Sequence, residues 1–224
     1  KNVMKNKISG KIVALLLTLI IVATSGMPLY AKETGDKANS FRYENGQSIA
    51  KAVPFSTLSP NAWKKIDGKY YSGDGSVIEG AVAKGIDVSH HQGTVDWKKA
   101  KEDGVEFAII RCGFGMNQTK QDDAQWFNNV KGCEENNIPY GVYLYSYADT
   151  VKKAQSEAEH VLRLIKGHTL AYPVYYDIEE KAVLNKLTAE QLGKIAATFV
   201  NKVKAEGYQT GIYSNKSNFE TFLT

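Results

Sequence analysis

Strand-like and helix-like stretches alternate five times between residues 83 and 224. The strand-like stretches are short and apolar or aromatic, and they cover residues 85–89, 107–112, 140–147, 173–180 and 210–214. Helical patterns follow at residues 95–103, 121–136, 150–165 and 188–206, with another helix start near residue 217. Because parallel strands need long crossover connections, this alternation predicts an α/β fold with a parallel sheet and helices outside it. The order fits both an open doubly wound sheet and a barrel.

Two of the helical patterns carry boundary signals. Thr188 is placed as an N-cap, Gln191 completes a capping box three residues later, and Gly207 ends the helix. The pattern at residues 150–165 keeps its apolar residues on one face, and Gly167 follows it as a stop. Both stretches are therefore expected to be amphipathic helices that pack on the sheet.

Two acids, Asp177 and Glu179, stand near the end of the fourth strand-like stretch. At strand spacing they point to one face with Cα atoms roughly 6.5–7 Å apart. Like charges held so close resist ionising together, so the pKa of one carboxyl group rises. A proton donor beside a second carboxylate is what glycoside hydrolysis requires. Alone, the spacing is more typical of two solvated acids at a strand end.

A third acid, Asp87, lies on the first strand-like stretch, and we expect it at the C-terminal end of that strand. Acids at the C-terminal ends of two strands favour a barrel, because a barrel collects its active site at that face. No Gly-rich phosphate loop follows the first strand, where a dinucleotide-binding fold would place one. His90 and His91 adjoin Asp87, but we expect consecutive rings to point apart, and no third ligand stands at a recognisable spacing. We therefore expect neither a metal ion nor a cofactor.

The start of the chain has the pattern of an export signal. Residues 1–31 contain four lysines and no acid, an apolar run at residues 12–24, and small residues before Ala31. This predicts a secretory signal peptide cleaved after Ala31, since the apolar run is short for a span of ~20 residues. The protein is then secreted, extracellular or associated with the cell wall, and it is membrane-anchored if the segment is retained. Without these lysines the formal net charge of +4 falls near zero, so we expect no nucleic-acid partner.

Residues 32–82 are expected to form a linker that contains one hairpin. Asp67-Gly68 and Asp74-Gly75 are turn signals beside aromatic residues, and they predict the hairpin within residues 63–80. The hairpin resembles one copy of the aromatic-and-glycine repeat of wall-binding modules. The alternative is a hairpin that simply packs against the next domain, at residues 83–224.

Five motifs in one order resemble glycoside hydrolase family 25 (GH25), a family of secreted muramidases, or lysozymes, with an irregular TIM-like (β/α) barrel. The first is Gly85-Ile-Asp-Val-Ser-His-His-Gln-Gly93, which Val-Asp-Trp97 follows. The others are residues 107–111, residues 141–147 with their three tyrosines, Asp177-Ile-Glu179, and Gly211-Ile-Tyr213-Ser. The resemblance covers residues 83–224, and it rests on the ordered set rather than on any single motif.

The resemblance implies hydrolysis of the β-1,4 bond between N-acetylmuramic acid and N-acetylglucosamine in peptidoglycan, by a monomer that acts on glycan strands. It implies that Glu179 is the general acid. Asp177 would stabilise positive charge at the anomeric carbon or orient the acetamido group of the substrate. Asp87 falls where the family keeps an active-site acid.

Three tyrosines are candidate substrate-binding residues. Tyr143 and Tyr213 match positions where the family lines its sugar cleft with tyrosines, and Tyr145 shares the inward parity of Tyr143. For each of them, packing inside the barrel is the alternative.

The chain departs from the family pattern in two ways. Some members carry a Glu near the end of the second strand, where this chain has Phe114. The family's last strands, with a further active-site Asp, are not in this sequence, so we expect an unclosed sheet and a truncated catalytic domain.

Two other functions compete with a muramidase. One is an inactive or wall-binding remnant, which the missing strands and the hairpin favour. The other is a chitinase-like hydrolase, which would carry acids two and four residues before Asp177, where this chain has Tyr175 and Pro173. Cys112 and Cys133 are the only cysteines, and the sequence leaves open whether they form a disulfide or stay buried thiols.

Overall fold

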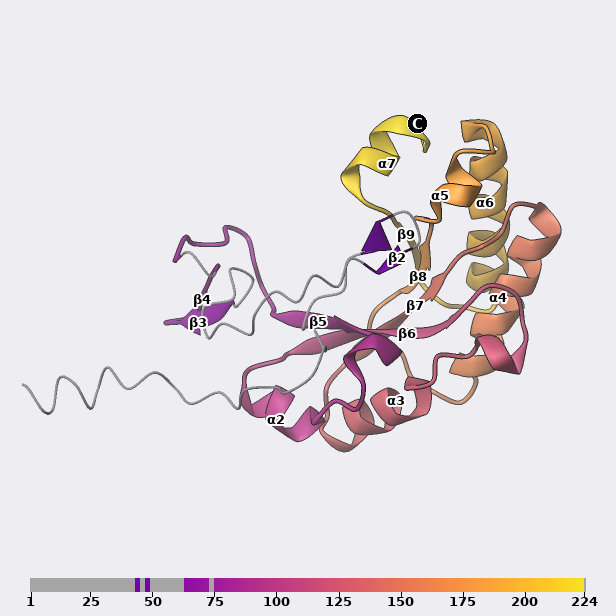
Figure 1. Cartoon of the computed structure of the whole chain (residues 1–224). Coiled ribbons are helices and arrows are strands. Elements are labelled where there is room, and N and C mark those ends of the chain that lie inside the picture. The colour runs from indigo at the N-terminus through magenta and orange to yellow at the C-terminus, as the bar shows by residue number, and fades with distance from the viewer. Residues whose placement is uncertain (1–42, 45–46, 49–62, 73–74, 224) are drawn as a thin grey trace, which may run out of the picture.

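A five-stranded parallel sheet forms the centre of the protein (Figure 1). The computed structural model describes residues 43–44, 47–48, 63–72 and 75–223. The sheet strands lie side by side in chain order: β5 (Gly85–Val88), β6 (Phe107–Phe114), β7 (Tyr140–Tyr145), β8 (Val174–Asp177) and β9 (Thr210–Tyr213). The α/β prediction is confirmed. In a barrel the strands follow one another in space in chain order, as they do here, whereas in a doubly wound sheet the strand order reverses at a switch point.

Helices connect the strands and cover the outer side of the curved sheet (Figure 1). α3 and α4 pack on β6, and α6 packs on β8 and β9 and beside α4. The helices are α2 (Trp97–Glu102), α3 (Trp126–Glu135), α4 (Val151–Ile165), α5 (Lys181–Leu184), α6 (Ala189–Ala205) and α7 (Lys216–Thr221), with 3-10 turns η1 (His90–Gln92) and η2 (Thr119–Gln121). Each strand therefore ends at the same edge of the sheet, where its loop begins.

The boundary signals of the two longest helices are confirmed. The hydroxyl of Thr188 accepts a hydrogen bond from Gln191 N, and Gln191 Oε1 accepts one from Thr188 N, which completes the capping box of α6. Thr150 caps α4 in the same way through Lys153 N. The predicted strand at residues 173–180 is too long, because β8 ends at Asp177 and the chain then turns into α5.

The core lies between the sheet and the helices. The ring of Tyr176 on β8 stacks on that of Phe199 on α6, with centroids 3.9 Å apart and planes 6° from parallel.

Cys112 and Cys133 are both buried and form no disulfide. The Cys112 thiol donates to Tyr143 O at 3.2 Å. Burial raises the pKa of both thiols, that of Cys133 to about 12.

A short hairpin precedes the sheet. Its strands β3 (Lys64–Ile66) and β4 (Lys69–Tyr71) pair around Asp67-Gly68, where both residues have positive φ angles, as a tight I′ turn needs. Tyr70 is buried, and its hydroxyl donates to Glu106 and to Val82 O. Lys65 Nζ donates to the same carboxylate at 2.7 Å. The hairpin is therefore held at the N-terminal end of β6, opposite the edge that carries Asp177.

Two-residue strands β1 (Tyr43–Glu44) and β2 (Gln47–Ser48) pair antiparallel within the predicted linker. The predicted signal peptide at residues 1–31 lies outside the described residues. Within the described part of the chain, no helix combines the length and the apolar character needed to cross a membrane.

Candidate active site

The carboxyl ends of neighbouring strands bring an acid and two tyrosines into one row. Asp177, the last residue of β8, is the register partner of Tyr145 on β7 and of Tyr213 on β9. Side chains at register partners of parallel strands point to the same face of a sheet. The row therefore places Asp177 between two aromatic side chains, at the edge where a barrel builds its active site.

Asp177 is a buried acid with an unsatisfied oxygen. It is 4% exposed, and its Oδ1 has no hydrogen-bond partner among the described residues. Burial raises its pKa well above the ordinary value, the negative charges of Glu179 and Asp87 raise it further, and Arg111 opposes the shift. A carboxyl group kept neutral in this way can donate a hydrogen bond. The surroundings of Asp177 thus favour its neutral form.

Glu179 lies beyond the end of β8, so the expectation that it stands within the strand is wrong. Its Oε1 accepts hydrogen bonds from N of Asn215 at 3.0 Å and from Nδ2 of the same residue at 3.2 Å. Asn215 is also the N-cap of α7, where its side chain accepts from Asn218 N. The start of α7 therefore fixes the orientation of a half-exposed carboxylate beside Asp177.

Asp87 completes a group of three acids. Asp87 is the third residue of β5 and is accessible to solvent, yet it is partly desolvated by the groups around it, and this desolvation raises its pKa. A hydrogen bond with Tyr143 and the charge of Arg111 oppose the rise, while Glu179 adds to it. Asp87 in turn raises the pKa of Asp177. The structure therefore brings Asp87, Asp177 and Glu179 within electrostatic reach of one another although β6 and β7 separate their strands.

The three candidate tyrosines, Tyr143, Tyr145 and Tyr213, all lie near these acids. Burial and then the charge of Asp87 raise the pKa of Tyr143 well above its usual range. The Tyr145 hydroxyl donates to Glu180 Oε2 at 3.4 Å. Tyr213 is 50% exposed, and burial, followed by the charges of the three acids, raises its pKa to about 12. All three rings therefore border the acid group, and Tyr213 is the most accessible of them.

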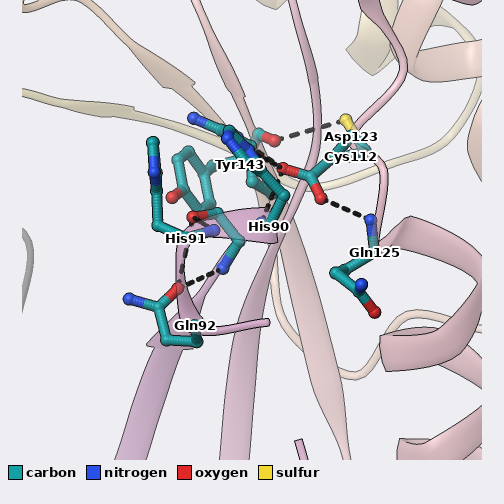
Figure 2. A network of polar contacts seen from close by, with 9 residues as sticks. His90, His91, Gln92, Cys112, Asp123, Gln125 and Tyr143 are labelled. Atoms are coloured by element: carbon teal, nitrogen blue, oxygen red, sulfur yellow. Dashed lines mark hydrogen bonds and ion pairs between the residues drawn. The ribbon is translucent and has the colours of Figure 1, made fainter. Parts of the chain in front are cut away.

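A buried ion pair that was not predicted from the sequence supports the site, and Figure 2 shows its acidic member, Asp123, near His90 and Gln125. Arg111 Nε donates to Asp123 Oδ2 at 2.7 Å, and the guanidinium group also contacts His90 Nδ1. The Asp123 side chain is fully buried, and it accepts further bonds from His90 N and Gln125 N. Arg111 lowers the pKa of Asp87 and opposes the rise at Asp177. An arginine inside an otherwise apolar strand was the available signal, because a buried charge needs a partner.

The expectation that His90 and His91 point apart is wrong. Their ring centroids lie 3.9 Å apart, because the chain turns into η1 after Ser89 instead of continuing as a strand (Figure 2). Burial, then the charges of His90 and Arg111, lower the pKa of His91 to about 4. Among the described residues, no three His, Cys, Asp or Glu side chains gather in a way that could hold a metal ion.

Comparisons of the chain with known proteins point to one family. The family model for glycosyl hydrolases family 25 matches residues 86–223. The autolytic lysozyme of Clostridium acetobutylicum is 28% identical over 131 residues, which is 58% of this chain and 38% of that protein. The modular autolysin LytC of Streptococcus pneumoniae is 33% identical with a TM-score of 0.61, over 72% of this chain and 39% of LytC.

A family 25 glycosyl hydrolase from Bacillus anthracis shares the fold at 20% identity, with a TM-score of 0.58 over 66% of this chain and 67% of that one. The chain spans less than two fifths of the length of the lysozyme and of LytC. The five parallel strands have the (β/α) barrel-like arrangement of these structures. Because the family model covers more than half of the sequence, the chain belongs to glycosyl hydrolases family 25.

Proposed function

We propose that this protein hydrolyses the β-1,4 bond between N-acetylmuramic acid and N-acetylglucosamine in peptidoglycan. The observation that carries the proposal is the buried Asp177, whose Oδ1 has no hydrogen-bond partner among the described residues, beside the partly exposed Glu179 at the carboxyl ends of parallel strands. LytC, to which the chain is similar, has been solved in complex with a synthetic peptidoglycan ligand, which supports glycan strands as the partner.

Glu179 is the proposed proton donor to the glycosidic oxygen. It is the more accessible member of the pair, and the two hydrogen bonds from Asn215 hold its carboxyl group in one orientation. A positioned acid contributes about 100-fold or more to the rate of such a step. Asp87 and Tyr143 lie close enough to contribute charge and a hydroxyl group on the other side of the site.

The resemblance implies that Asp177 either stabilises positive charge at the anomeric carbon or orients the acetamido group, and the raised pKa of Asp177 favours one of these roles. Stabilising positive charge needs an ionised carboxylate, whereas holding the acetamido carbonyl needs a neutral carboxyl that donates a hydrogen bond. Burial and the neighbouring acids favour the neutral form of Asp177. We therefore assign Asp177 to orienting the acetamido group of the substrate.

Export follows from the same proposal, because peptidoglycan lies outside the cytoplasmic membrane. The basic and apolar pattern of residues 1–31 supports a cleaved signal peptide and a secreted or wall-associated protein. Cell fractionation and the mass of the exported chain test this, and a chain retained in the cytoplasm would contradict it.

The test of the activity is mass spectrometry of soluble products from purified peptidoglycan incubated with the full chain. New reducing ends on muramic acid are expected, and Glu179→Gln should lower their rate of appearance by at least about 100-fold. Glu190→Gln, on the exposed face of α6, is the matched control and should retain full activity. Circular dichroism confirms the fold of each variant. Near-normal activity of Glu179→Gln, or glycan binding without products by the folded native chain, would refute the proposal, and the latter would indicate a wall-binding remnant.

A further inference from the structure

Three aromatic rings continue from the acid group over the carboxyl ends of β6 and β7. The ring centroid of Tyr147 lies 5.2 Å from that of Tyr145 at a tilt of 57°, and 6.4 Å from that of Phe114 in an edge contact of 79°. Tyr147 is 44% exposed, and Phe114 and Tyr145 are partly exposed. We call these three residues the aromatic platform. The family resemblance assigns no role to Phe114 or Tyr147, and Phe114 stands where some members carry Glu.

The register of the sheet connects the aromatic platform to the acids. Phe114 is the register partner of Tyr145, which is the register partner of Asp177. Neighbouring strands lie about 4.8 Å apart, so Phe114 stands roughly 10 Å from Asp177 along this row. The platform therefore begins beside the proposed site of cleavage and extends from it in one direction, toward β6.

Buried polar groups hold the exposed ring of Tyr147 in place. Its backbone N donates to Glu157 Oε1 at 2.8 Å, and Glu157 is fully buried in α4. The other oxygen of Glu157 accepts from the hydroxyl groups of Ser146 and Tyr176. Burying a carboxyl group costs free energy, and two of the three hydrogen bonds that Glu157 accepts here, from Tyr147 N and Ser146, fix the chain segment that carries the exposed ring.

Contacts also hold the Phe114 end of the aromatic platform in place. The guanidinium carbon of Arg111 lies 5.8 Å from the centroid of the Phe114 ring, a cation–π contact. Gly115 N donates to Tyr145 O at 2.9 Å, which joins the ends of β6 and β7 behind the rings. A rigid aromatic surface binds at a lower entropic cost than one that must be ordered by its ligand.

We propose that the aromatic platform is a subsite that binds a pyranose ring of the glycan strand, beyond the two sugars that flank the cleaved bond. A β-linked pyranose exposes a face of C–H groups that packs on aromatic faces. The occupant is the substrate's own chain, because the platform continues the row that contains Asp177. The inference rests on the proposed function in one respect, namely that the bound glycan is peptidoglycan.

The test measures binding rather than turnover. Titration calorimetry of the full chain uses chitohexaose, a β-1,4-linked N-acetylglucosamine hexamer, and chitobiose as the short probe. We expect Tyr147→Ala to weaken chitohexaose binding roughly 3- to 10-fold, the range of aromatic contacts, with the affinity for chitobiose unchanged. Tyr147→Phe should retain most of the affinity. Phe127→Ala is the matched control, because Phe127 is an exposed ring on the outer helix α3.

Several outcomes would overturn the subsite: no binding of chitohexaose by the native chain, equal binding by Tyr147→Ala, or an equal loss in Phe127→Ala. If Tyr147→Ala fails to fold, Phe114→Leu replaces it with the same expectation. Chitohexaose binding that depends on Tyr147, in a protein that releases no products from peptidoglycan, would support the subsite and refute the proposed hydrolysis. On soluble peptidoglycan strands, Tyr147→Ala should raise KM several-fold with kcat unchanged.

Discussion

Glu157 offers a sharp test of how a buried carboxyl group is tolerated in this fold. In Glu157→Ala, the hydroxyl groups of Ser146 and Tyr176, 2.9 Å apart, can bond to each other. That leaves Tyr147 N and one hydroxyl hydrogen without an acceptor, at about 1–3 kcal/mol each. With a small cavity added, we expect Glu157→Ala to lower the free energy of unfolding by about 3–5 kcal/mol.

Glu157→Gln should behave differently. The amide oxygen can still accept from Tyr147 N, and the hydroxyl groups of Ser146 and Tyr176 can rotate to accept from the amide nitrogen. Since the interactions are retained and no charge is buried, we expect a change within about 1 kcal/mol at neutral pH. Glu157→Ala and Glu157→Gln therefore separate loss of the hydrogen bonds from loss of the charge.

The pH dependence of the Gln variant follows from the pKa of Glu157. Burial raises this pKa in the folded protein, against opposing hydrogen bonds from Tyr176, Tyr147 and Ser146. The folded state then holds a proton that the unfolded chain has released, so this group's contribution is complete below the unfolded pKa and is lost as pH rises through the folded one. The native protein should lose this contribution with rising pH, and the Gln variant should not.

Urea denaturation at about pH 4 and about pH 7.5 measures both effects. The stability of Glu157→Gln relative to the native chain should improve from the lower pH to the higher. Destabilisation of Glu157→Gln as large as that of Glu157→Ala at the higher pH would refute the reasoning. It would mean that hydrogen bonds to an ionised Glu157 outweigh the cost of burying its charge.

Three further predictions follow from the site and the hairpin. Asp177→Asn, which keeps a hydrogen-bond donor, should retain more activity than Asp177→Ala on purified peptidoglycan; equal activities of the two variants would argue against the acetamido role. Arg111→Met should cost about 3–5 kcal/mol of stability by leaving the buried Asp123 unpaired, and adding Asp123→Asn should recover part of it in urea titrations. Glu106→Gln should speed hydrogen exchange in β4 while leaving exchange in β7 unchanged, because Glu106 accepts from both Lys65 and Tyr70; equal exchange in β4 would show that the hairpin is held by other contacts.

The architecture could be predicted from the sequence because its signals are local. Five apolar stretches separated by amphipathic ones can bury their surfaces only as a sheet covered by helices. Thr188, Gln191 and Gly207 mark helix ends through bonds that span three or four residues, so the chain order alone reveals them. The Asp67-Gly68 turn was recognisable for the same reason, since its two positive φ angles depend on the dipeptide itself.

The sequence also identified the acids Asp87, Asp177 and Glu179, because carboxyl residues at the ends of parallel strands must meet at one edge of the sheet. Which of them would be buried could not be predicted, because burial depends on strands that are distant in the chain. The carboxyl group of Asp177, the last residue of β8, is buried, whereas that of Glu179 accepts a hydrogen bond from Asn215, the N-cap residue of α7. Only the tertiary structure could therefore show that Asp177 has the raised pKa.

The supporting networks were likewise decided by tertiary contacts. Arg111 and Asp123 are separated by a strand end and a loop, and Glu157 meets Ser146 and Tyr176 from another layer of the fold. Local propensity does not encode such pairings, because a charged residue in an apolar pattern fits many partners until packing selects one. The sequence determined the order of elements and the chemistry at their ends, and the packing of helices on the curved sheet determined which charges are buried, paired or exposed.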